Sequence, residues 1–183
     1  MPTDPSYTPA ADIARDREHL ISRFIATRSQ SEQIAGRLSV EDQQVQSMPD
    51  VSPTKWHLAH VTWFFETFVL KPHAPGYDEF DPAFGYLVNS YYETLGPRPS
   101  NDEVMAYRAH VDQAVRAFML ASDDETFAAA ADLLELGIHH EQQHQELALM
   151  DIKHVLSCNP LAPAYRKKEP VSVRETHTLG WVE

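Results

Sequence analysis

Hydrophobic residues recur every three or four positions along most of this chain, which is the spacing of an amphipathic helix. The alternation of apolar and polar residues that is typical of strands is hard to find before residue 170. The pattern predicts four long helices, at about 8–38, 52–70, 101–121 and 123–156. Because each helix must bury its apolar stripe, we expect an all-α fold, an antiparallel four-helix bundle.

Capping signals support these helix starts. Residues 100–103 (SNDE) and 122–125 (SDDE) have the S-x-x-E spacing of a capping box, in which the hydroxyl and the carboxylate each bond a backbone amide of the other residue. Ser52 followed by Pro53 is a start signal for the second helix, because proline is favoured at the first helical position. We expect that helix to end near residue 70, before Pro72.

The connection between the second and third long helices is unusually long. Residues 71–99 are rich in Pro, Gly, Tyr and Asp, with one short helix expected around 83–92. A connection of this length inside a compact domain is often functional. The chain from Pro160 onwards contains three prolines and a short alternating run at 171–173. We therefore divide the chain into a helical bundle at 1–160 and an irregular C-terminal tail at 161–183 that leads into a further domain.

Composition narrows the class of protein. The chain has 183 residues, with 15 basic and 27 acidic side chains and a formal net charge of -12. This charge disfavours nucleic acid and anionic membrane surfaces as partners. No stretch approaches the roughly 18–20 apolar residues of a membrane span, and the N-terminus lacks a signal-peptide pattern. The single cysteine, Cys158, excludes an internal disulfide and fits a reducing compartment, so we expect a cytoplasmic protein.

The last long helix contains a metal-binding pattern. The letters HEQQH, beginning at His140, match the H-E-x-x-H motif of zinc proteases. Residues four apart lie on the same face of a helix, so His140 and His144 can bind one ion. Gly137, one turn earlier, leaves space for a neighbouring helix or a ligand. A third imidazole can come from His57 or His60 in the second helix, and spacing alone does not separate these two.

Two known classes of metal enzyme fit this chain poorly. An extended zinc-protease motif would need glycine at Leu147 and histidine at Met150, and the chain lacks a strand that would align a peptide. A ferritin-like di-iron site needs E-x-x-H elements on two helices and further inward glutamates. Glu141 and His144 form one such element, but the second helix offers only Glu66. We therefore favour neither class.

Three separated segments, in this order, resemble one family: SMPDVSPTKWHLAHVTWFFETFVL, LVNSYYETLGPRP and GIHHEQQHQELALMDIKHVL. They are similar to the N-terminal DinB-like domain of the sulfoxide synthases of ergothioneine biosynthesis, and the similarity covers nearly the whole chain. In that family, one histidine from the second helix and two at i, i+4 on the last helix hold a non-haem iron(II). The resemblance therefore implies Fe(II) as cofactor and His60, His140 and His144 as its ligands, with His57 as a neighbour.

The resemblance also implies a reaction. These synthases join a cysteine-containing thiol, commonly γ-glutamylcysteine, to the imidazole C2 of hercynine (trimethylhistidine), with O2 as oxidant, and form a sulfoxide. Three imidazole ligands leave up to three positions for the thiolate, the substrate imidazole and O2. By resemblance, Gln143 lies beside the substrate as a hydrogen-bonding group. Arg98, in the GPRP turn, is the candidate partner for a carboxylate of the thiol substrate, because a guanidinium can bind a carboxylate bidentately.

Synthases of this family continue into a C-terminal domain of the formylglycine-generating-enzyme type, which supplies a catalytic tyrosine and much of the hercynine pocket. The last residues, HTLGWVE, resemble the first strand of that domain. We therefore expect a part of a longer enzyme, which binds metal but has little or no synthase activity alone. One alternative is a stand-alone DinB-like protein that uses another divalent metal for thiol-dependent transfer. Another is a helical bundle that only binds a partner or dimerises.

Overall fold

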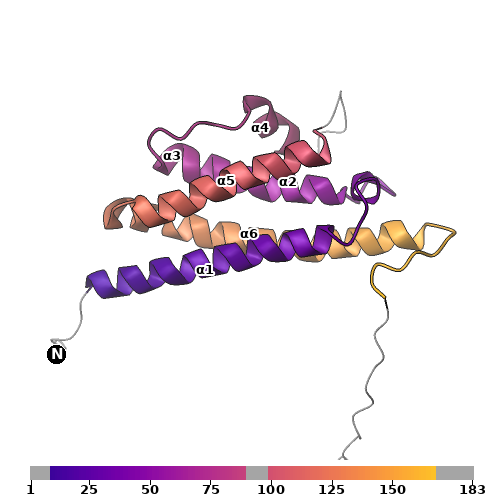
Figure 1. Cartoon of the computed structure of the whole chain (residues 1–183), viewed down its shortest axis with the longest axis horizontal. Helices are drawn as coiled ribbons and strands as arrows, with labels where there is room; N and C mark the ends of the chain where they lie inside the picture. The colour runs from indigo at the N-terminus through magenta and orange to yellow at the C-terminus, as the bar shows by residue number, and fades with distance from the viewer. Residues whose placement is uncertain (1–8, 90–98, 168–183) are drawn as a thin grey trace, which may run out of the picture.

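A computed structural model describes residues 9–89 and 99–167, which form a bundle of four long helices (Figure 1). The bundle helices are α1 (Pro9–Ala35), α2 (Thr54–Phe65), α5 (Asn101–Ala121) and α6 (Asp124–Ser157). These described residues include no β-strand, so the predicted all-α four-helix bundle is confirmed. None of their helices is both long enough and apolar enough to cross a membrane. Most of the predicted tail, residues 168–183, lies outside the described part of the chain.

The helix directions explain the long connection. Lys55 at the start of α2 donates a hydrogen bond to the carbonyl of Pro99, just before α5, at 2.9 Å. Further along both helices, Tyr107 donates to Glu66 at 2.5 Å. Helices α2 and α5 are therefore parallel, whereas α2 and α6 are antiparallel, since His57 contacts Asp151 and His60 lies beside His140. A parallel pair needs a connection that returns along the bundle, and Figure 1 shows its described part, residues 71–89, running back beside these helices.

The second helix continues further than the sequence predicted. After α2, the chain forms a π-helical turn, η2 (Glu66–Leu70), and then a short helix, α3 (Lys71–His73). We expected the helical segment to end before Pro72, but this proline lies in the first turn of α3. The backbone N–H groups in the first turn of a helix have no acceptor within that helix. A proline, which lacks an N–H, is therefore tolerated there. The correction places the connection's start at residue 74.

The connection contains α4 (Pro82–Val88), which overlaps the helix predicted at 83–92; residues 90–92 lie outside the described part. The capping box predicted for α5 is present between Ser100 and Glu103. The box predicted at 122–125 is not. The cap of α6 is Asp123, one residue later, and its carboxylate accepts a hydrogen bond from the next helical turn at 2.8 Å.

Helices α2 and α6 approach each other closely at Gly137. The aromatic ring of Phe65 lies against this glycine, and a Cβ atom placed there would be 2.5 Å from its Cε1 atom. Phe65 is itself buried and packs edge-on against Phe24 of α1, with ring centroids 5.0 Å apart. The space predicted beside Gly137 is therefore filled by the neighbouring helix. This contact sets how closely α2 and α6 can pack.

A buried ion-pair network joins α1, α5 and α6. Glu141 of α6 is only 1% exposed, and its two carboxylate oxygens lie 2.9 Å from Nη1 of Arg28 and 2.7 Å from Nη2 of Arg108. Ser31 donates a further hydrogen bond to the same carboxylate at 2.6 Å. Asp112 lies 2.7 Å from Nε of Arg28, close enough for an ion pair although the N–H is not aligned for a hydrogen bond. Each charge of this network thus has an opposite charge beside it.

Burial alone would raise the pKa of Glu141, but the charges of Arg28 and Arg108 and the bond from Ser31 outweigh it and lower the pKa to about 2. The carboxylate therefore stays ionised at every pH at which the protein is normally studied. A buried ion pair can contribute little net stability, but the loss of one partner leaves an uncompensated charge in the interior.

We expect Gly137→Ala to lower the free energy of unfolding, because the added methyl group collides with Phe65. Alanine favours the helical backbone over glycine by about 1 kcal/mol, and overpacking costs about 1–3 kcal/mol, so the net loss should be up to about 2 kcal/mol. Urea unfolding followed by circular dichroism measures it. Gly85→Ala in α4 is the matched control, since a Cβ there meets nothing within 4 Å. Equal stability of the two variants would contradict the close contact.

We expect Glu141→Gln to destabilise the protein by about 3–5 kcal/mol, because Arg28 and Arg108 lose their shared negative charge inside the bundle. Glu146→Gln, at an exposed position of the same helix, is the control and should change stability by less than about 0.5 kcal/mol. The folded-state pKa of Glu141 lies below its ordinary value, so this stabilisation should disappear as the pH falls from about 4.5 towards 2. A loss below about 1 kcal/mol at neutral pH would contradict the role of this network.

Candidate metal centre

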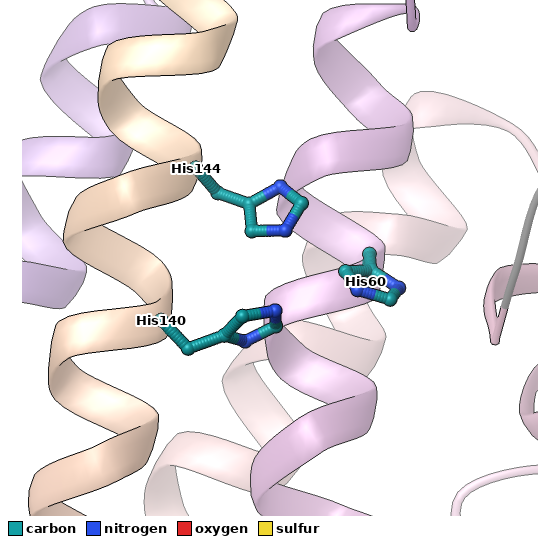
Figure 2. A group of neighbouring side chains, drawn as sticks. All are labelled: His60, His140 and His144. Carbon is teal, nitrogen blue, oxygen red and sulfur yellow. The ribbon is translucent and has the colours of Figure 1, made fainter.

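Three histidines converge in the seam between α2 and α6. His60 comes from α2 and His140 and His144 come from successive turns of α6, with one ligand atom from each lying within 4.8 Å of the others (Figure 2). All three rings are half-buried, so the group is reachable from solvent. Within the described residues, no aspartate, glutamate or cysteine joins this group. The centre is a set of three imidazoles.

Helix geometry explains why α6 supplies two of them. Residues four apart differ by about 40° around a helix and about 6 Å along it, so His140 and His144 point the same way. Gly137 lies on this side of α6 and lets α2 come close. The ring of His60 therefore reaches both α6 rings, with ring centroids 5.2 Å from His140 and 4.8 Å from His144.

The long connection orients His60. Nδ1 of His60 lies 2.7 Å from the backbone carbonyl of Val88, at the end of α4. A carbonyl can only accept, so Nδ1 carries the proton and Nε2 keeps its lone pair for a metal. Metal-binding histidines commonly hold their other ring nitrogen in this way. The functional role expected for residues 71–99 therefore has a physical basis in this hydrogen bond, which no side-chain motif in the sequence could reveal.

His57 lies behind His144, outside the group of three. Its Nδ1 is 2.9 Å from Nδ1 of His144, and its Nε2 is 2.9 Å from Oδ2 of Asp151. Spacing alone could not separate His57 from His60, and the structure brings His60 into the group of three. Sequence reasoning considered Asp151 only as a near match to a di-iron element with His154, although its position seven residues after His144, two helical turns along the same face, is a usable signal.

Burial keeps the three rings neutral. Desolvation is the largest cause in each case: it lowers the pKa of His60, and together with the nearby His60 ring it lowers the pKa of His140 to about 4. For His144, desolvation and the neighbouring histidines lower the pKa to about 3. Nδ1 of His140 is buried and has no hydrogen-bond partner among the described residues. Neutral imidazoles with converging nitrogen atoms are what a divalent metal ion requires, so these residues fit a metal.

Aromatic rings border the group. Trp56 stacks on His60, with ring centroids 4.6 Å apart and planes 12° apart, and Trp63 lies against the same ring at 5.4 Å. Phe64 lies beside His140 at 4.9 Å. These apolar surfaces restrict water around the imidazoles and hold their planes in place. Interactions of a bound ion with charged ligands are stronger in such surroundings.

The remaining predicted residues differ in where they lie. Gln143 is exposed on α6, three residues after His140 and therefore beside the same helix face. Arg98 lies outside the described residues. Glu141, the second letter of the H-E-x-x-H pattern, is bonded to Arg28 and Arg108 on the side of α6 that faces α1 and α5. It therefore has no role as a base at the metal centre.

We expect the metal affinity of this centre to change little between pH 7.5 and 5.5. Ligands with the ordinary histidine pKa of about 6.5 would each become about tenfold less available at pH 5.5, which weakens a three-histidine site by about 10³-fold. Because the pKa values of His140 and His144 are lowered to about 4 and about 3, protons compete only at lower pH. Calorimetric titration with Zn²⁺ should show a loss of less than about tenfold. A loss near 10³-fold would show that the free rings titrate normally.

Comparison with known families agrees with this architecture. A family model described as the DinB superfamily matches residues 23–148, which run from α1 into α6 and include all three histidines. A search of the curated proteins finds none that matches this chain. The matched segment covers more than half of the sequence and nearly the whole bundle. The chain therefore belongs to the DinB superfamily.

Proposed function

We propose that the centre binds iron(II) and serves the oxidative joining of a cysteine-containing thiol to hercynine, with O2 as oxidant, in ergothioneine biosynthesis. The observation that carries the proposal is the ligand set, because His60, His140 and His144 converge without a carboxylate. Three neutral ligands leave the charge of the ion available to a thiolate and leave coordination positions open. Membership of the DinB superfamily and the resemblance of three sequence segments to the sulfoxide synthases support the choice.

The chain's own residues hold and shape this centre. When bound, iron(II) would supply redox chemistry with O2 and a positive charge beside the thiolate. Val88 orients His60 through its carbonyl, and the rings of Trp56 and Phe64 limit the access of water to the ligands. Excluding water strengthens the interactions of charged groups inside the site and limits side reactions. These features favour a site for a charged thiolate.

Two side chains are proposed to bind substrates. The amide of Gln143 is exposed beside His140 and can both donate and accept hydrogen bonds with a polar substrate. Arg98, which lies outside the described residues, is proposed to bind a carboxylate of the thiol substrate bidentately. Neither residue is a metal ligand in this proposal, so their substitution should weaken substrate binding and leave metal content unchanged.

A thiol-dependent transferase is the alternative function, since imidazole ligands also suit zinc and nickel. It shares the three-histidine ligand set and the superfamily with the proposal. The two functions differ in the metal that is retained and in the need for O2. Metal content and thiol binding therefore distinguish them before any turnover is measured.

We expect anaerobically purified protein to retain stoichiometric iron(II), measured by elemental analysis. His60→Ala and His140→Ala should lose it, because two histidines seldom hold a catalytic ion that normally has three protein nitrogens. His139→Ala is the matched control, because this exposed neighbour of His140 contacts Glu135 and Arg23 and is not in the group of three. Zinc or nickel retained in preference to iron would favour the transferase. Protein without any metal would contradict both functions.

Thiol binding provides a second test of the proposed function. Adding γ-glutamylcysteine to cobalt(II)-substituted protein should produce a thiolate-to-cobalt charge-transfer band, because the ion stabilises the thiolate. Gln143→Ala should weaken this binding or that of hercynine without loss of cobalt. Any product that the iron form makes from both substrates and O2 is then identified by mass spectrometry, and we expect little or none from this chain alone. Thiol transfer that proceeds equally well without O2 would contradict the proposal.

A further inference from the structure

We propose that His57 and Asp151 form a positioning pair that sets the tautomer of His144, so that this ligand presents Nε2 to the metal. The inference deepens the proposed function and rests on the same metal centre. It concerns residues that are not ligands themselves. Asp151 of α6, His57 of α2 and His144 of α6 form a continuous chain of contacts, each 2.9 Å long.

The partners determine where the protons lie. An ionised carboxylate can only accept, so Nε2 of His57 donates its proton to Asp151. In a neutral imidazole the other nitrogen is then an acceptor, so Nδ1 of His57 accepts from Nδ1–H of His144. This leaves the lone pair of His144 on Nε2, the nitrogen that does not contact His57. The opposite arrangement, with His57 donating to His144, would place a proton on Nε2 and block the metal.

Both members of this pair are buried. His57 and Asp151 are only 5% and 6% exposed, so water cannot readily replace either partner. The backbone N–H of Ser52, just before α2, donates to the same Oδ2 atom of Asp151 at 3.0 Å. The carboxylate is therefore held by two groups, one just before α2 and one within α2. A buried hydrogen-bonded pair of this kind orients a ring more firmly than a surface contact would.

The three ligands differ in how their orientation is set. His60 is held by the carbonyl of Val88, which no single side-chain substitution removes. His140 has no hydrogen-bond partner at Nδ1 among the described residues. His144 is thus the ligand whose tautomer depends on side chains. Loss of such an outer partner commonly weakens metal binding by about 10–100-fold.

The test compares wild type with His57→Leu, His57→Gln and Asp151→Asn. Long-range ¹H–¹⁵N spectra of apo-protein labelled at histidine report the tautomer of each ring, and calorimetric titration with Zn²⁺ reports affinity. We expect His144 to carry its proton on Nδ1 in wild type. His57→Leu should lose this preference and bind Zn²⁺ about 10–100-fold more weakly. His57→Gln should recover most of the affinity, because its amide oxygen can still accept from His144.

Asp151→Asn covers the case in which His57→Leu fails to fold, and should also weaken the tautomer preference. A His144 proton on Nε2 in wild type would overturn the inference, as would wild-type affinity in a folded His57→Leu protein. Equal losses in His57→Leu and His57→Gln would also overturn it, because they would indicate a packing role only. If wild type binds no Zn²⁺, the metal centre itself fails, and the apo-protein tautomer still decides the inference separately.

Discussion

The buried carboxylate of Glu141 constrains the rest of this structure. It lies between two guanidinium groups, Arg28 from α1 and Arg108 from α5, and is bonded to both. A charge in the interior must stay beside opposite charges, so this contact fixes the rotation of α6 about its own axis. With one side of α6 held against α1 and α5, the adjacent side, which carries His140 and His144, faces α2 (Figure 2). The ion-pair network and the metal centre thus lie on two adjacent faces of α6.

The seam between α2 and α6 combines close packing with chemistry. Gly137 allows the ring of Phe65 to lie against the backbone of α6, which brings the two helices within reach of a shared ligand set. The long connection between α2 and α5 contributes in a second way. Because α2 and α5 are parallel, this connection must run back along the bundle, and on its way it places the Val88 carbonyl on His60. The topology of the bundle therefore supplies one of the groups that orient the centre.

The site also explains why the H-E-x-x-H pattern is misleading here. Both histidines take part in the centre, but the intervening glutamate belongs to a different, structural network. In a zinc protease the glutamate acts as a base at the metal. In this chain the third imidazole comes from α2, and the partners behind the ligands are His57 and Asp151. In this chain the H-E-x-x-H pattern therefore identifies two members of the three-histidine group and no base beside it.

The sequence by itself determined the elements that depend on local spacing: the four long helices, the capping box at the start of α5, and the pairing of His140 with His144. Periodicity, capping and i, i+4 geometry act within one helix, so they can be read without knowing its neighbours. Tertiary structure decided which histidine of α2 joins the pair, because His57 and His60 are only three positions apart and the rotation of α2 against α6 distinguishes them. It also decided the parallel direction of α2 and α5, the role of Glu141, and the bond from a backbone carbonyl that has no side-chain signature.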